Sequence, residues 1–214
     1  MWTGRLAMFV ALMTCAGIAQ GTPEEQEVLR LMEGTIYTVA HRETADGVLG
    51  ACGLEFGVFG RDNATRQGGP VIAIGSFYFR KIGLQVAYSL KLGVRDVIGM
   101  TSSPPFAPAN AFVRAPRGAA PPKPIRSESD TPGFALFLGS IDDSVAATYK
   151  AILEERRFVV GFNRRPGQQD VNIEVDLSVK DAKMVGAEVV RTRSRDMVDD
   201  FNACVGDLLQ AGKR

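Results

Sequence analysis

Apolar and polar side chains alternate along much of the chain. Between residues 84 and 95 nearly every second residue is apolar, and residues 52–58 repeat the pattern with glycine or glutamate in the intervening positions. A period of two is that of a β-strand with one buried and one solvated face. Alternation or a β-rich composition predicts further strands at residues 35–42, 71–80, 134–138, 158–163, 171–179 and 185–191.

Three segments carry apolar residues at helical spacing. The first begins after Thr22 and Pro23, which suit a helix N-cap and first turn, and ends near Gly34. The second is predicted at residues 142–156, with Ser140 or Asp142 as its cap. The third is predicted at residues 194–212.

These elements define an α+β chain. Clean alternation favours antiparallel strands with one solvated face, so we expect a largely antiparallel sheet of about 6–8 strands. An N-terminal helix, one middle helix and a C-terminal helix are expected to pack on its other face. Residues 22–214 should form a single domain, interrupted at residues 99–133 by an irregular segment that holds most of the chain's 11 prolines.

The first 21 residues have the order of an export signal. Arg5 precedes an uncharged run from Leu6 to Ala19, and small residues follow it. The run has about 14 residues, fewer than the roughly 20 that a membrane-spanning helix needs. The sequence therefore predicts a cleaved signal and a periplasmic or extracellular protein. An uncleaved anchor, or lipidation of Cys15, is the alternative.

Charge and hydropathy narrow the partner classes. Arg5 is the only charged residue of the signal, so the remaining 193 residues carry 24 basic and 24 acidic side chains. This balance argues against nucleic acid as a partner. A second long apolar run is absent from the sequence, so we do not expect an integral membrane protein after cleavage.

Two cysteines remain after cleavage, Cys52 and Cys204. Cys52 alternates in phase with core-side residues of its strand, and Cys204 belongs to the apolar stripe of the last helix. An exported protein meets oxidising conditions, so the sequence predicts a disulfide between them. Two buried free thiols are the alternative.

The candidates for catalysis are few. His41 is the chain's only histidine and could act as a general base. Glu174 and Asp176 lie two apart on one strand, about 7 Å along it, and with Glu55 they are the carboxylates that could serve in glycoside hydrolysis. The ordinary explanation is a structural or surface histidine for His41 and a solvated side chain for each carboxylate, and we favour it over catalysis. A single histidine and cysteines without zinc-site spacing do not fit a zinc site. The sequence predicts no cofactor.

Basic residues gather in and after the proline-rich segment. They could bind an acidic glycan, a lipid headgroup or an envelope protein, but scattered solvated arginines are the usual explanation of such residues. The residues are Arg114, Arg117, Lys123, Arg126, Arg156, Arg157, Arg164 and Arg165.

The sequence favours a non-enzymatic, exported binding or envelope-associated module over an enzyme. One alternative is a small exported hydrolase that uses carboxylates on the sheet face. A second is a secreted inhibitor or effector that docks through the proline-rich segment. Ligand and partner identity do not follow from the sequence.

Overall fold

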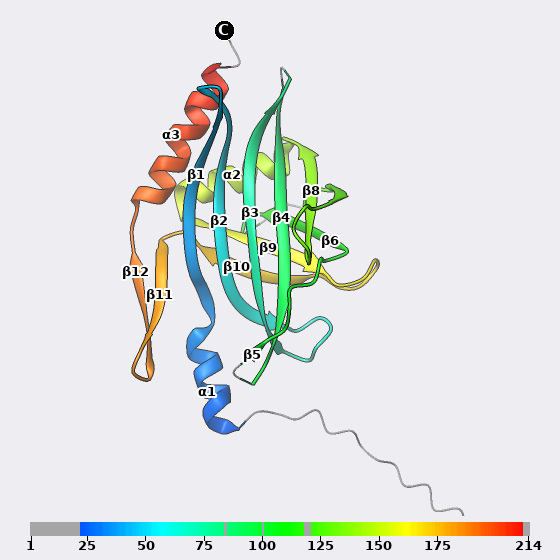
Figure 1. Cartoon of the computed structure of the whole chain (residues 1–214), viewed down its shortest axis with the longest axis vertical. Coiled ribbons are helices and arrows are strands. Elements are labelled where there is room, and N and C mark those ends of the chain that lie inside the picture. The colour runs from blue at the N-terminus through cyan, green and yellow to red at the C-terminus, as the bar shows by residue number, and fades with distance from the viewer. Residues whose placement is uncertain (1–21, 84, 100, 118–120, 212–214) are drawn as a thin grey trace, which may run out of the picture.

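A computed structural model describes residues 22–211 apart from residues 84, 100 and 118–120, and over this range it contains two antiparallel sheets and three helices (Figure 1). The larger sheet has nine strands in the order β12–β11–β1–β2–β3–β4–β8–β7, with β5 paired to β4. The smaller sheet has the order β10–β9–β6. The α+β class predicted from the sequence is confirmed.

The bounds of the elements follow chain order. The helices are α1 (Pro23–Met32), α2 (Asp143–Glu155) and α3 (Asp196–Ala211). The strands of the larger sheet are β1 (Gly34–Ala45), β2 (Val48–Asp62), β3 (Gly69–Ile82), β4 (Gln85–Ile98), β5 (Thr101–Ser102), β7 (Ile125–Glu128), β8 (Phe134–Ser140), β11 (Val179–Val185) and β12 (Glu188–Arg193). Those of the smaller sheet are β6 (Asn110–Arg114), β9 (Arg157–Asn163) and β10 (Val171–Asp176).

Long hairpins build the centre of the larger sheet. Asp46 and Gly47 join β1 to β2 with φ angles of 52° and 76°, as a two-residue type I′ turn requires. Along β2, β3 and β4, one set of alternate residues is fully buried, including Leu54, Phe77 and Leu90. The alternation in the sequence therefore assigns the two faces of β2 and β4 correctly, whereas in β3 apolar residues occupy both faces and the sequence does not single out the buried one.

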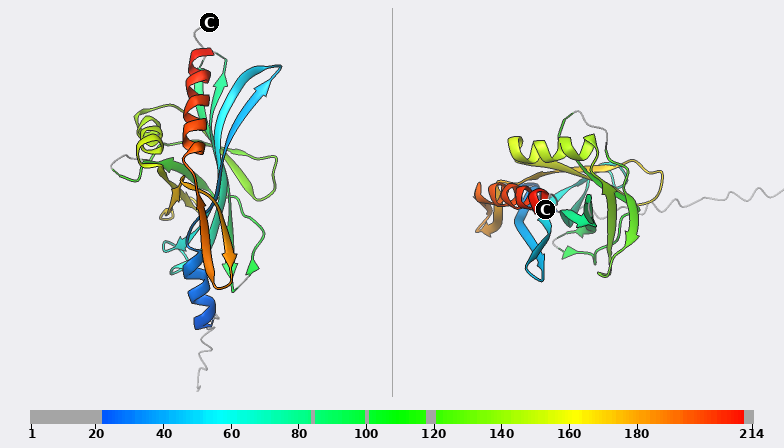
Figure 2. Two further views of the ribbon diagram at one scale, coloured as in Figure 1. Left: turned by 90° about the vertical axis from the view of Figure 1, so that its left-hand side faces the viewer. Right: turned by 90° about the horizontal axis from the view of Figure 1, so that it is seen from above.

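The buried face of the larger sheet is covered by the smaller sheet and two helices. Strand β10 packs on β1 and β2, and α3 packs on the same two strands, whereas α2 packs chiefly on β6 and β9. Figure 2 shows α2 and α3 on one side of the larger sheet. Because the smaller sheet separates α2 from the larger one, the expected single layer of three helices on a sheet is wrong in this detail.

A disulfide between Cys52 and Cys204 joins β2 to α3, as the sequence predicts. Their Cα atoms lie 5.8 Å apart, and the two residues are 0% and 2% exposed. Both cysteines belong to the main hydrophobic cluster. The bridge therefore fixes the C-terminal helix to the buried face of the sheet.

Helix α1 lies on the opposite face of the larger sheet, at its lower end in Figure 1. Its Leu29 packs with Phe59 and is flanked by Ile72. On β3, Ile72 lies between Val71 and Ala73, which are fully buried in the core, so it points to the opposite, open face of the sheet. The N-terminal helix therefore covers part of the open face and not the buried one.

Both ends of α1 are capped by side chains. The Thr22 hydroxyl accepts from the Glu25 backbone N–H, and the Glu25 carboxylate accepts from that of Thr22, which forms a capping box. At the other end the Arg191 guanidinium donates to the carbonyls of residues 31–33. Arg191 therefore ties α1 to β12.

The proline-rich segment at residues 99–133 is only partly irregular. It contains β5, β6 and β7, which the periodicity does not predict, and its prolines lie outside these strands. Proline donates no ladder hydrogen bond, so this placement is the one a sheet tolerates. Ala111, Phe112 and Val113 of β6 are buried in the core.

Candidate functional site

The open face of the larger sheet carries a row of polar side chains across three strands. Glu55 on β2 is opposite Ser76 on β3, and Ser76 is opposite Lys91 on β4. Neighbouring strands lie about 4.8 Å apart, so Glu55 and Lys91 stand roughly 10 Å apart at their Cα atoms. Ser76 therefore occupies the middle of a row with opposite charges at its two ends.

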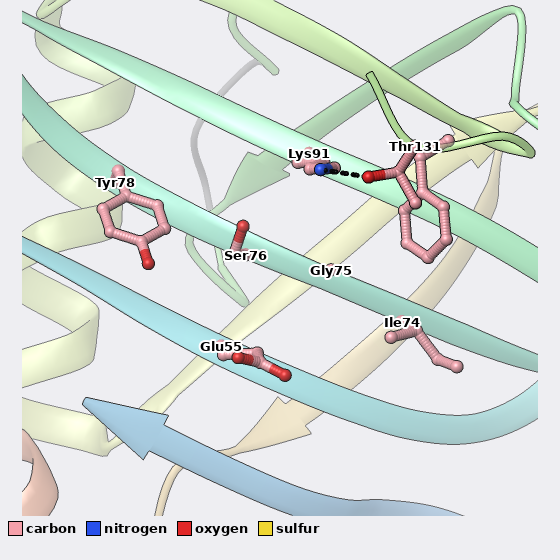
Figure 3. A pocket seen from close by; sticks show the side chains of 8 residues that line it. Glu55, Ile74, Gly75, Ser76, Tyr78, Lys91 and Thr131 are labelled. Carbon is pink, nitrogen blue, oxygen red and sulfur yellow. Dashed lines mark hydrogen bonds between the residues drawn. The ribbon is translucent and has the colours of Figure 1, made fainter. Parts of the chain in front are cut away.

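This row crosses a pocket of about 260 Å³ (Figure 3). Ser76 and Gly75 lie in its middle, between Glu55 on one side and Lys91 on the other. Tyr78 lies at one end along β3, and Ile74 lies at the other. The described residues that line it are Glu55, Ile74, Gly75, Ser76, Tyr78, Lys91, Thr131 and Phe134.

Aromatic rings around the pocket lie against glycines of the sheet. A Cβ atom on Gly53 would come within 2.3 Å of the Tyr78 ring, and one on Gly93 within 2.8 Å of the Phe134 ring. Real Cβ atoms do not approach so closely, so only glycine leaves room for these rings. Tyr37 lies over Gly57 in the same way.

Glu55 is held by two neighbours on β1. The Tyr37 hydroxyl donates to Glu55 Oε1 over 3.2 Å, and His41 Nε2 lies 3.0 Å from Glu55 Oε2. The His41 and Glu55 side chains are 38% and 43% exposed, so this contact adds little stability. The structure thus brings together two of the predicted candidates, with Glu55 in the pocket and His41 beside it.

The tyrosines near Glu55 remain neutral hydrogen-bond donors at ordinary pH. Burial, followed by the charge of Glu55 and the hydrogen bond to it, raises the pKa of Tyr37 to about 12. Burial, and then Glu43, raises the pKa of Tyr78 to about 12. The Arg80 guanidinium lies 4.6 Å from the Tyr78 ring centroid and pairs with Glu43, which holds this end of the pocket in place.

The opposite side of the pocket is built on Lys91. Its ammonium group donates to Asp130 Oδ1 over 2.9 Å and to Thr131 Oγ1 over 2.7 Å. The hydrogen bond from Lys91, foremost, holds the pKa of Asp130 below its usual value. Gly133 has a φ of 80° and packs against the Pro105 carbonyl, where a Cβ atom would come within 2.2 Å. These contacts fix the loop between β7 and β8 as a wall of the pocket.

The other two carboxylates predicted for catalysis lie outside the pocket. Glu174 on β10 accepts a hydrogen bond from Arg157 over 3.0 Å. Asp176 pairs with Arg193 over 2.8 Å and also accepts from Ser178. Burial raises the pKa of Asp176, but the hydrogen bonds from Ser178 and Arg193 outweigh it and lower this pKa overall.

The predicted basic residues are dispersed. Arg114 donates to Asn172, Arg126 to the Pro108 carbonyl, and Arg157 to Glu174. Arg156 is the left-handed residue at the end of α2, with a φ of 54°. Arg117, Lys123 and Arg165 are exposed.

Arg164 belongs to a largely buried ion-pair cluster. Its guanidinium contacts Asp62 Oδ2 over 2.7 Å and Asp96 Oδ1 over 2.6 Å, and Arg66 also pairs with Asp96. It lies 4.6 Å from the Phe106 ring centroid. The cluster links β2 and β4 to the turn between β9 and β10, which is a structural role.

The carboxyl of Asp62 is fully buried in this cluster. Burial raises its pKa, but hydrogen bonds from Thr65, foremost, and from Arg164 more than offset this and lower the pKa overall. Asp62 is therefore ionised at neutral pH and satisfied by its neighbours. Thr65 is also the last residue of an Asn63-Ala64-Thr65 glycosylation sequon, which lies in the loop after β2.

Comparison with known proteins gives no relative: no family model matches the chain, and neither do any curated protein or solved structure. In the described part of the chain, no helix is long and apolar enough to cross a membrane. The same residues contain no group of three or more His, Cys, Asp or Glu side chains arranged to hold a metal ion. The predicted export signal, with Cys15, lies outside the residues that the structure describes.

Sequence reasoning missed most of the pocket. Tyr37, Ser76, Tyr78, Lys91 and Phe134 are ordinary strand residues when each is considered alone. The available signal was glycine at positions 53, 57 and 93, where a strand favours larger residues. A glycine on the solvated face of a central strand indicates that a neighbouring ring lies on it.

Proposed function

We propose that this protein is an exported, non-enzymatic binding module whose small polar ligand occupies the pocket on the open face of the larger sheet. The observation that carries the proposal is the row Glu55–Ser76–Lys91, set between aromatic rings that lie on glycines. A concave site with apolar walls and a few convergent polar groups is the usual form of a small-molecule site. The buried disulfide is compatible with an oxidising, exported location.

The arrangement of carboxylates favours binding over hydrolysis. Among the described residues that line the pocket, Glu55 is the sole carboxylate, whereas glycoside hydrolysis by the common mechanisms needs a facing pair. Glu174 and Asp176, the other two candidates, are engaged by arginines elsewhere. His41 Nε2 contacts Glu55, so this nitrogen is not placed to activate a serine hydroxyl as a nucleophile.

Filling the pocket tests the proposal. Ser76→Trp places a large side chain in the middle of the row, and aromatic residues are well tolerated on a sheet surface. Thr192→Trp is the matched control, because Thr192 is an exposed hydroxyl residue on β12, away from the pocket. Both variants should keep the disulfide and a cooperative thermal transition.

The assay is a thermal-shift screen of the three proteins against a defined set of sugars, amino acids, nucleosides, polyamines and dicarboxylates. We expect at least one class to stabilise the wild type and Thr192→Trp but not Ser76→Trp. Stabilisation of all three proteins alike would place the ligand elsewhere. A set without any binder would reject the pocket as a ligand site.

A further inference from the structure

We infer that the ligand of the pocket is a neutral carbohydrate, bound through one hexose ring. This inference rests on the function proposed above and specifies its ligand class. It comes from the hydrogen-bonding capacity that the pocket leaves unused, from the partners that its charged groups already have and from the position of its apolar surfaces.

The unused hydrogen-bonding capacity alternates along the row. A carboxylate has about four acceptor positions, and Glu55 uses its two oxygens once each, toward Tyr37 and His41. An ammonium group has three N–H donors, of which Lys91 gives one to Asp130 and one to Thr131. The Ser76 hydroxyl makes no hydrogen bond within the described part of the chain and can both donate and accept.

Adjacent sugar hydroxyls match this set. Each hydroxyl is at once a donor and an acceptor, so one can donate to Glu55, the next can exchange hydrogen bonds with Ser76, and a third can accept from Lys91. Hydrogen bonds to the two charged groups are the stronger ones. A ligand with donors alone or acceptors alone would satisfy only one end of the row.

The charged groups of the pocket already have partners. Lys91 Nζ lies 2.9 Å from Asp130, and the two Glu55 carboxylate oxygens are contacted by Tyr37 and by His41 Nε2. A charged ligand group would have to compete with these partners, whereas a neutral hydroxyl adds to them. This pairing favours an uncharged ligand over an amino acid or an acidic sugar.

Ile74 and Phe134 form an apolar surface beside the row, at one end of the pocket along the strands. Ile74 and the Phe134 ring line this end, and Lys91 Nζ lies 5.9 Å from the centre of the ring. A hexose ring has hydroxyls along its edge and C–H groups on its faces. The negative face of an aromatic ring attracts such C–H groups, so the ring can contact Phe134 while its edge meets Ser76.

In the test, the protein lacking residues 1–21 is titrated with methyl glycosides of glucose, galactose, mannose and N-acetylglucosamine. Calorimetry and NMR measure the binding. Glycine betaine, free lysine and inorganic phosphate form the charged comparison set. We expect saturable binding of at least one glycoside, with a dissociation constant that hardly changes with salt, because screening acts only between charges. Glu55→Gln should weaken binding at least about tenfold, as expected for loss of a charged hydrogen-bond acceptor.

Glu174→Gln is the matched control, because Glu174 is an exposed, arginine-paired glutamate outside the pocket. It should bind the glycoside like the wild type. If a charged probe binds in a manner that Ser76→Trp abolishes while no glycoside does, the carbohydrate inference is wrong and the proposed binding function stands. If neither set binds, the carbohydrate inference fails, and the wider thermal-shift screen described above decides the proposed binding function.

Discussion

Removing the disulfide should cost this protein a large part of its stability. The bridge between Cys52 and Cys204 closes a loop with a sequence separation of 152 residues. In the chain-entropy model a loop of this length restricts the unfolded chain by about 5 kcal/mol at room temperature. Measured losses for native disulfides fall between about 2 and 5 kcal/mol, and the whole stability of a domain is about 5–15 kcal/mol.

The double variant Cys52→Ala, Cys204→Ala isolates this effect. Both sites are buried, and alanine avoids placing an unpaired hydroxyl in the core. With a denaturant slope of about 2–3 kcal/mol per molar urea, the unfolding midpoint should fall by about 1–2 M. Intrinsic fluorescence and circular dichroism in urea should give coincident transitions for both proteins.

Reductant supplies the independent control. Wild-type protein unfolded in urea with reductant should approach the midpoint of the double variant, which reductant should leave unchanged. Equal midpoints for the oxidised wild type and the double variant would refute the reasoning. A loss in this range would show that the fold is markedly more stable where the disulfide is kept oxidised.

Two further changes test the ion-pair cluster and the ring-on-glycine contacts. Arg164→Met should lower the free energy of unfolding by roughly 3–5 kcal/mol at neutral pH, because it leaves the buried Asp62 carboxylate without its arginine partner. The pKa of Asp62 is lowered in the folded protein, so the stability that this carboxylate contributes is complete above its unfolded-state pKa and is lost as pH falls through its folded-state pKa. The difference in unfolding free energy between the wild type and Arg164→Met should therefore shrink below about pH 4, which urea titrations can measure. Gly53→Ala should destabilise by about 1–3 kcal/mol and displace the Tyr78 ring, which calorimetry and NMR can measure.

Matched variants separate these effects from general damage. Arg165→Met changes an exposed neighbour of Arg164 and should leave the midpoint within about 0.5 kcal/mol of the wild type. Gly206→Ala adds a Cβ that meets no atom within 4 Å in α3, and it should stabilise by up to about 1 kcal/mol. A pH-independent Arg164→Met defect, or a Gly53→Ala variant with unchanged Tyr78 resonances, would contradict the two mechanisms.

Local patterns in the sequence were sufficient for most of the individual elements. The period-two alternation identified β2 and β4 and their buried faces, and Thr22 and Asp142 cap the helices as expected. The disulfide was predictable because both cysteines lie in phase with apolar core positions. Each of these signals resides within one strand or one helix, where the period and the cap fix the structure.

The division into two sheets could not be predicted in this way. The hairpin of β9 and β10 was expected, but its third strand, β6, comes from the proline-rich segment, with Asn110 opposite Asn163. Pairing over such a separation is decided by burial of Ala111 and Val113 in the finished core. A composition rich in proline obscured a strand of five residues that tertiary packing stabilises.

The candidate site required the register between strands, which no single strand specifies. Glu55 was predicted and His41 was predicted, but their 3.0 Å contact depends on β1 and β2 pairing with His41 opposite Gly53. A slip of one residue would turn one of these side chains to the buried face. The hairpin turn at Asp46–Gly47 and the register shift between Glu43 and Thr44 together fix that register. The glycines that admit the rings and the turn that aligns the strands therefore determine the pocket together, and a change at either should abolish binding while the polar residues remain.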